Sequence, residues 1–297
     1  MSLLNYTALE FISQVFQCDI KDIKNIQAMK NGMTNDSYVF DVDQKRYIIR
    51  IPGKGSAELV NRKMEYNVYQ TIAEYNITDP MVYLSAENSY KITEYLDNVQ
   101  NCDPRNWEEV EISMNALRAF HNLKLTMDYS FAIYDNIEKY DKLIADHGSE
   151  FSNYQENKEK AYELRDFIQK YAQPFYLSHI DSNHDNFLLN NQQNQVFMID
   201  WEYAGMQDQD LDIAMFTIYA GYNKEEFDKL ICIYCQGKCK LARRLKIYAY
   251  ACIAGFLWGI WAEYKKICGV DFGDYTNLQY SYIENYYPII KEEMKNI

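Results

Sequence analysis

Residues 179–186 read HIDSNHDN and crowd two histidines, two aspartates and two asparagines between two apolar segments. Ionised carboxylates and amide oxygens are the ligands that Mg²⁺ prefers, and a carboxylate can also orient or accept a proton. Burying such groups beside core-forming residues is costly, so their concentration indicates a chemical role for this stretch.

The spacing within and after this octet indicates phosphoryl transfer. His179, Asp181 and Asn186 follow the pattern H-x-D-x4-N, and Asp200 comes fourteen residues after Asn186. This order is typical of a kinase catalytic loop followed by its metal-binding aspartate. We expect Asp181 to act as the base or orienting group and His179 to brace the loop. A polar loop rich in turn formers is the alternative, because H-x-D-x4-N alone occurs often by chance.

The N-terminal third contains groups that could bind phosphates. Two β-rich runs, 38–42 and 47–51, flank a short polar stretch and predict a hairpin. Arg50 ends the second run, where kinases place the basic residue that holds phosphates, and Glu65 on the next predicted helix could pair with it. The residues expected to form a phosphate-covering loop before the hairpin are Asn31, Gly32, Thr34 and Asn35.

Each of these residues also has an ordinary structural explanation, as a turn, a surface cation or a solvated helix face. The prediction therefore rests on their agreement in order and spacing. The sequence has neither G-x-G-x-x-G before the hairpin nor G-x4-G-K-[ST]. The second absence excludes a P-loop enzyme, and the first favours small-molecule kinases over protein kinases.

The remaining pattern predicts an α+β, two-lobed, protein-kinase-like fold. Residues 1–97 are expected to form a small sheet with one inserted helix over 58–74, and 98–297 a larger, mostly helical lobe. A second hairpin is expected over 187–199, between Asn186 and Asp200, with a hinge near 95–100. Ligands commonly bind between lobes.

Composition narrows the class of partner. The net charge of −13 disfavours nucleic acid. The first residues lack the positive region of a signal peptide, and the uncharged stretch 247–262 is short for a bilayer span, so we expect a cytoplasmic protein without membrane insertion.

Cys232, Cys235 and Cys239 form C-x2-C-x3-C; reduced thiols are favoured over a metal site because no nearby histidine completes a ligand set. The sequence does not predict an oligomeric state.

Several motifs together resemble the choline/ethanolamine kinases, and most closely the bacterial choline kinases that supply phosphocholine for cell-surface decoration. The likeness extends from about residue 28 to 280. The segments that carry it are GMTN at 32–35, IRIPG at 49–53, H-x-D at 179–181, IDWEY at 199–203, LWGIW at 257–261 and DFGDY at 271–275. The catalytic loop alone is shared with aminoglycoside phosphotransferases.

The resemblance implies ATP and Mg²⁺ as cofactors and a small amino alcohol, choline, as substrate. It makes Asp181 the catalytic aspartate and places Asn183 near the transferred phosphoryl group. It assigns Asn186, Asp200 and Glu202 to magnesium, and the backbone of Glu94 to Leu96 to adenine. The aromatic residues it places around the quaternary ammonium are Tyr203, Trp258, Trp261 and Tyr275. Aromatic faces bind such a cation by cation–π attraction, although buried aromatics can also be simple core residues.

One position departs from the family pattern. On the helix after Asp212, where choline kinases commonly carry an acidic residue near the cationic head, this sequence has Tyr219. An aromatic ring can still contact the cation, so Tyr219 joins the expected substrate residues. Ethanolamine or an aminoglycoside remains an alternative substrate, and a catalytically inactive ligand-binding kinase fold is a third hypothesis.

Overall fold

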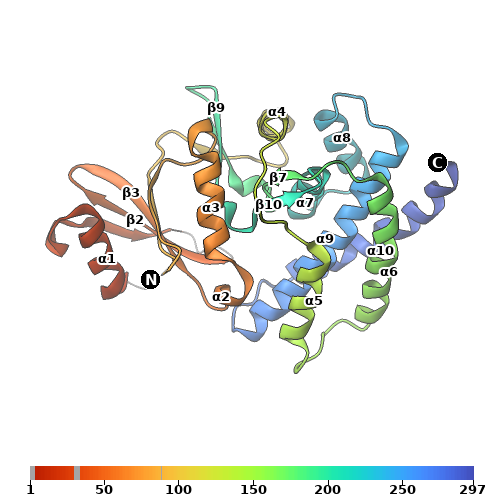
Figure 1. Cartoon of the computed structure of the whole chain (residues 1–297), viewed down its shortest axis with the longest axis horizontal. Helices are drawn as coiled ribbons and strands as arrows, with labels where there is room; N and C mark the ends of the chain where they lie inside the picture. The colour runs from red at the N-terminus through yellow and green to blue at the C-terminus, as the bar shows by residue number, and fades with distance from the viewer. Residues whose placement is uncertain (1–3, 30–33, 88) are drawn as a thin grey trace.

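The structure is a computed structural model that describes residues 4–29, 34–87 and 89–297. An antiparallel five-stranded sheet with strand order β1-β2-β3-β5-β4 forms the N-terminal part (Figure 1). Its strands are β1 Lys24–Ala28, β2 Asn35–Val42, β3 Lys45–Pro52, β4 Met81–Leu84 and β5 Lys91–Glu94. Helix α1 (Tyr6–Phe16) packs on this sheet through Phe16, which contacts the rings of Phe40 and Tyr47. Strand β1 was not predicted from the sequence.

The predicted hairpin between β2 and β3 is confirmed. Val42 pairs with Lys45, so the loop consists of Asp43 and Gln44, with φ of 49° and 65°. A two-residue loop with both residues at positive φ matches the right-handed twist of its strands. This tight turn fixes the register that places Arg50 near the end of β3.

The prediction of a single helix over 58–74 is wrong in one respect, because the chain forms two helices in this region. Helix α2 (Ser56–Leu59) ends before Asn61, whose side chain accepts the backbone N–H of Met64 at 3.3 Å and caps α3 (Arg62–Ile72). An asparagine at this position satisfies an otherwise free helix donor and favours a new start. The break puts Arg62 and Glu65 in the first turn of α3.

Helices and short strands make up the larger C-terminal part. The helices are α4 Trp107–Asn122, α5 Ile133–Ile144, α6 Tyr154–Tyr171, α7 Asp210–Ala220, α8 Lys224–Tyr234, α9 Leu241–Ile267 and α10 Tyr275–Glu293. The predicted hairpin is present as β8 (Phe187–Asn190) and β9 (Gln195–Met198). Strand β6 (Gln100–Asn101) pairs with β8 and extends this sheet to three strands. Strands β7 (Tyr176–Ser178) and β10 (Gly205–Gln207) pair with each other. These two and β6 were missed, since two or three residues show no measurable periodicity.

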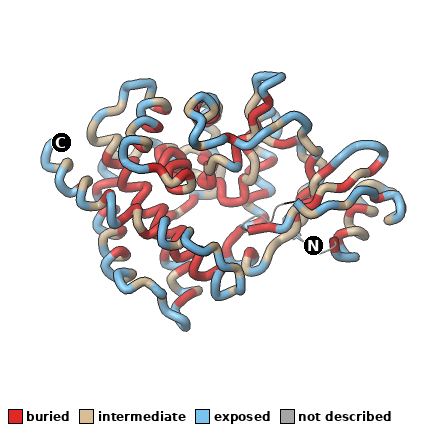
Figure 2. Tube along the Cα trace, turned by 180° about the vertical axis from the view of Figure 1, so that it is seen from behind, coloured by how far each residue is buried: buried red, intermediate tan, exposed pale blue. Residues whose placement is uncertain are grey.

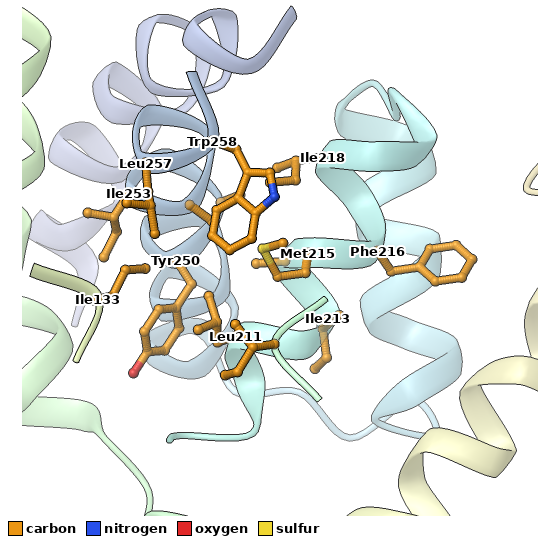
Figure 3. Close-up of a cluster of buried hydrophobic side chains, with 14 of the residues drawn as sticks. Ile133, Leu211, Ile213, Met215, Phe216, Ile218, Tyr250, Ile253, Leu257 and Trp258 are labelled. Carbon is orange, nitrogen blue, oxygen red and sulfur yellow. The ribbon is translucent and has the colours of Figure 1, made fainter. Parts of the chain in front are cut away.

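Helix α9 forms the centre of the helical part. In the part of the chain that the structure describes, α9 alone is long and apolar enough to span a membrane, and its apolar stretch is entirely buried. It packs against α5, α6, α7 and α10, and Figure 2 shows buried segments concentrated in this region. Figure 3 shows Tyr250, Ile253 and Leu257 of α9 among apolar side chains that include Leu211 and Met215 of α7. Helix α9 is therefore a core helix.

The contact between α9 and α10 depends on glycine. A Cβ on Gly255 would lie 2.5 Å from the backbone oxygen of Gln279, and one on Gly259 would lie 2.7 Å from the Tyr280 ring. The two glycines, four residues apart, share one face of α9 and let α10 approach closely.

We predict that Gly255→Ala lowers the free energy of unfolding by about 1–3 kcal/mol, because overpacking against a backbone carbonyl forces the helices apart. Gly259→Ala is the companion variant and should also destabilise the fold, because the Tyr280 ring that its Cβ would meet is buried and packed against Phe151 and Phe256. Chemical denaturation monitored by circular dichroism measures both variants. Equal stability of Gly255→Ala and the wild type would contradict the close approach.

Candidate active site

The loop that carries Asp181 is held by a buried carboxylate from α7. Asp212 accepts hydrogen bonds from the backbone N–H of His179 at 2.8 Å and of Ile180 at 2.7 Å. Ile180 has φ of 68°, a left-handed conformation that is costly for a β-branched residue. The two hydrogen bonds stabilise this conformation, so Asp212 fixes the backbone that presents Asp181.

Two asparagines surround the Asp181 carboxylate. The amide of Asn186, in the short 3₁₀ helix η3 (His184–Asn186), donates to the Asp181 carbonyl at 2.8 Å and to Oδ2 at 3.1 Å. Asn183 donates to Oδ1 at 3.3 Å. Because the amide nitrogen of Asn186 is used in this way, its Oδ1 is the atom suited to ligate a cation.

The Asp181 carboxyl is a strongly perturbed group. Burial raises its pKa well above the usual range, and the negative charge of Asp200 raises it further. Hydrogen bonds with Asn183 and Tyr219 act in the opposite direction and lower the pKa. A carboxylate with a raised pKa is a better proton acceptor near neutral pH.

His179 is completely buried, and its ring contacts the segment that follows β9. Its Nε2 lies 2.9 Å from the Ile199 carbonyl oxygen, and its ring contacts Trp201 with centroids 4.4 Å apart. Complete burial lowers the pKa of His179, which favours the neutral imidazole. These contacts tie the Asp181 loop to the segment before Asp200 and are compatible with a bracing role.

Arg50 connects the N-terminal sheet to the second half of the site. It forms an ion pair with Glu65 of α3, and its Nη1 donates to Asp200 Oδ1 at 2.8 Å. Burial disfavours the Arg50 charge, but Glu65, Glu202 and Asp200 outweigh burial and raise the Arg50 pKa. Asp200 itself has φ of 65°, and its side chain is 31% exposed, so one buried guanidinium holds a partly accessible carboxylate.

Arg62 is a central residue of the site that the sequence interpretation missed. Its Nη1 lies 2.9 Å from Glu65 Oε2 and 2.7 Å from Glu202 Oε2, and its Nη2 donates to Asn35 Oδ1 at 2.9 Å. Asn35 donates in turn to Glu202 at 2.8 Å. The sequence interpretation gave Arg62 no role, because its partner Glu202 lies 140 residues away.

These side chains form a buried cluster in which three carboxylates outnumber two guanidinium groups. One oxygen from each of Glu65, Asp200 and Glu202 lies within 4.8 Å of the others. Burial and Asp200 raise the pKa of Glu202, whereas Arg50 and Arg62 overcome burial and lower that of Glu65. The Ile199 N–H donates to the Asn186 carbonyl at 2.9 Å, which brings Asn186 next to the strand end that carries Asp200. The hard oxygen donors and excess negative charge fit Mg²⁺.

Two of the expected aromatic residues meet directly, and a third lies partly in the core. Trp261 donates its indole N–H to the Tyr203 hydroxyl at 3.1 Å, and Tyr203 contacts Trp258 with ring centroids 5.7 Å apart. Trp258 and Trp261 are each only 2% exposed, and Figure 3 shows the Trp258 indole pointing toward Met215 and Ile218. Burial raises the pKa of Tyr203, so its hydroxyl stays protonated.

Tyr219 and Tyr275 lie nearer to the Asp181 carboxylate. Tyr219 lowers the pKa of Asp181 by hydrogen bonding, and its ring centroid is 6.0 Å from that of Tyr275. Phe272, which the sequence interpretation did not select, contacts Tyr275 at 6.2 Å and stacks on Trp261 at 5.3 Å. A continuous series of aromatic contacts therefore runs from Asp181 to Trp261.

The expected nucleotide-binding segments are only partly described. Asn31 and Gly32 lie outside the described residues. Thr34 is buried, and its side chain is hydrogen-bonded to Tyr203. At the proposed adenine segment, the Glu94 N–H donates to the Pro80 carbonyl oxygen. The Leu96 N–H has no backbone partner in the described parts of the chain.

Comparison with known proteins identifies the class to which this site belongs. The sequence model of the choline/ethanolamine kinase family matches residues 26–237. Protein LicA of Haemophilus influenzae is 28% identical over 272 residues, covering 82% of this chain and 75% of the relative. The crystal structure of choline kinase LicA from Streptococcus pneumoniae has a TM-score of 0.82 at 23% identity, covering 95% of this chain and 98% of that one. A structure of LicA in complex with AMP has a TM-score of 0.84 at 23% identity, covering 98% and 100%.

The protein is a kinase with a two-lobed, protein-kinase-like fold, as the sequence predicted. More particularly, the chain belongs to the choline/ethanolamine kinase family.

The first prediction at the site concerns Arg62. We expect Arg62→Met to reduce kcat/KM about 10- to 100-fold, because residues that orient metal-binding groups typically contribute this much. It should also destabilise the fold, since two buried carboxylates lose a partner. Steady-state kinetics and thermal unfolding measure the two effects.

Lys63→Met is the matched control, because Lys63 is the exposed neighbour of Arg62 on α3. If Arg62→Met retained full kcat/KM, Arg62 would be a structural residue only.

The second prediction uses the raised pKa of Asp181. A carboxyl whose pKa is higher in the folded state destabilises the fold as the pH rises from its ordinary pKa toward the raised value. In magnesium-free and nucleotide-free buffer, Asp181→Asn should therefore raise the Tm, and more at pH 8 than at pH 5. Each kcal/mol gained corresponds to about 2–4 °C. Scanning calorimetry at both pH values makes the comparison.

Asp185→Asn, which removes an exposed carboxylate from the same loop, is the control and should show no such difference. An Asp181→Asn stabilisation that is independent of pH would contradict the raised pKa.

Proposed function

We propose that the protein transfers the γ-phosphoryl group of ATP to the hydroxyl of choline. The observation that carries this proposal is the contact between Asp181 and the aromatic series, which begins at Tyr219. A hydroxyl placed at Asp181 would leave the rest of a short amino alcohol beside aromatic rings. The related structures, of choline kinase LicA and of LicA in complex with AMP, agree with this substrate and with an adenine nucleotide.

Each residue has a defined part in the proposed reaction. Asp181 accepts a hydrogen bond from the substrate hydroxyl and takes its proton as the oxygen bonds to phosphorus and ADP departs. Asn183 stays close to Asp181 and can contact the transferred group. Arg50 holds the phosphates, and the segment from Glu94 to Leu96 receives adenine. In this proposal residues 1–97 hold the nucleotide, and residues 98–297 supply the catalytic and substrate-binding groups.

Asn186 and Asp200 would hold magnesium, with Glu202 next to them. Bound Mg²⁺ neutralises charge on the triphosphate and stabilises the charge that develops during transfer. Glu202 is already bonded to Arg62 and Asn35, so its oriented carboxylate can support the metal without leaving these partners. Arg50 occupies one oxygen of Asp200, and phosphate oxygens offer it an alternative partner.

Ethanolamine is the second candidate because of two phenol oxygens. Tyr219 is hydrogen-bonded to Asp181, and Tyr275 lies next to Tyr219 within the electrostatic influence of Asp181. Phenol oxygens can accept hydrogen bonds from a primary ammonium. Choline has no N–H to donate and depends on the ring faces instead. The number of rings in contact, from Tyr219 to Trp261, favours choline.

The experiment that tests the function is ADP release with ATP, Mg²⁺ and each of choline, ethanolamine and an aminoglycoside. We expect the highest kcat/KM with choline. In Tyr275→Leu, KM for choline should rise about 2- to 30-fold with little change in KM for ATP, as loss of one cation–π contact predicts.

Tyr66→Leu, which changes an exposed tyrosine on α3, is the control and should leave both constants unchanged. Higher kcat/KM with ethanolamine or an aminoglycoside would reject choline, and absence of turnover with every acceptor would reject the enzymatic proposal.

A further inference from the structure

The cysteine cluster of the sequence lies in a tight turn that the proposed reaction does not use. Cys235 follows the last residue of α8, and its carbonyl accepts the Lys238 N–H at 3.0 Å. This hydrogen bond closes a four-residue turn, with Gln236 and Gly237 at φ of 52° and 71°, and Cys239 follows directly. The turn folds the chain back on itself and brings Cys235 and Cys239 together.

Two of the three cysteines of the cluster, Cys235 and Cys239, form a pair. Cys235 and Cys239 are hydrogen-bonded to each other, and this bond lowers the pKa of Cys239 while it raises that of Cys235. Arg243 of α9 acts in the same direction on Cys239, whereas burial and Asp210 act against it, and the Cys239 Sγ lies 3.7 Å from the Lys240 carbonyl oxygen, to which its S–H can donate. Both thiols are partly accessible, and all seven cysteines are free. In the described residues, no group of potential metal ligands includes Cys232, Cys235 and Cys239 together.

We propose that Cys235 and Cys239 form a thiol–disulfide exchange site that low-molecular-weight disulfides oxidise reversibly. The Cys239 thiolate attacks one sulfur of the small disulfide and releases a small thiolate, which leaves a mixed disulfide. Cys235 then loses its proton, attacks the Cys239 sulfur and releases the second small thiolate. The protein loses two electrons and two protons, and the small disulfide is reduced to two thiols.

Hydrogen bonds connect this turn to the proposed catalytic loop. Tyr234 precedes Cys235, and its hydroxyl lies 2.6 Å from Nδ1 of His121. Nε2 of His121 lies 2.9 Å from Asp212 Oδ2, the carboxylate that holds the backbone of His179 and Ile180. A disulfide at Cys235 would form directly beside Tyr234, the last residue of α8. We infer that oxidation alters kcat through Tyr234, His121 and Asp212.

The test exposes the full-length protein to oxidised glutathione and then alkylates the remaining thiols. We expect two fewer alkylated cysteines than in the reduced protein, a peptide map with a Cys235–Cys239 disulfide, and full reversal by reduced glutathione. Cys232→Ser should behave in the same way, and Cys235→Ser should stop at a mixed disulfide on Cys239. No oxidation, or a disulfide through Cys232, would overturn the site.

Kinase activity of the oxidised and reduced protein tests the connection. We expect kcat to change at least threefold on oxidation and this response to disappear in Tyr234→Phe, which removes the hydroxyl bonded to His121. An oxidised protein with unchanged kcat would overturn the connection. Mass and peptide mapping detect the disulfide independently of turnover, so these results are distinguishable from failure of the proposed function.

Discussion

The buried cluster of Arg50, Arg62, Glu65, Asp200 and Glu202 is the interaction on which the site depends. A buried carboxylate without a partner costs several kcal/mol, so the buried Glu65 and Glu202 need the two guanidinium groups, whereas Asp200 stays partly exposed. The cluster joins β3 and α3 to the segment after β9, and its residues Arg50 and Asp200 are 150 residues apart in the sequence. It thus fixes the N-terminal sheet against the segment that carries Asp200 and Glu202. Its excess of one carboxylate suits it to gain a cation.

A second constraint sets the position of Asp181. Asp212 holds Ile180 in a left-handed conformation, and α7, which carries Asp212, is almost wholly buried against α9. The precision of the loop therefore depends on packing in the helical core, including the close contact of α9 with α10 at Gly255. The same two helices bring Trp261 and Tyr275 toward Asp181. The packing of the helical core consequently sets the positions of the side chains at the site.

The sequence predicted the features that are local or have a fixed order. The hairpins around Asp43 and after Asn186, and the kinase-like arrangement, follow from alternation, turn residues and motif spacing. Arg62 and Asp212 were not recognised as site residues because their partners lie far away in sequence and become visible only after folding. Trp258 shows the opposite limit: its spacing from Trp261 suggests a shared binding face, yet much of its ring lies in the core.

The most direct measurement of the central claim is a crystal structure with Mg²⁺, a non-hydrolysable ATP analogue and choline. The account predicts magnesium on the Asn186 and Asp200 oxygens, Arg50 turned from Asp200 toward a phosphate, and the choline hydroxyl within hydrogen-bonding distance of Asp181. A nucleotide bound with Arg50 still paired to Asp200, or a metal distant from both Asn186 and Asp200, would contradict it.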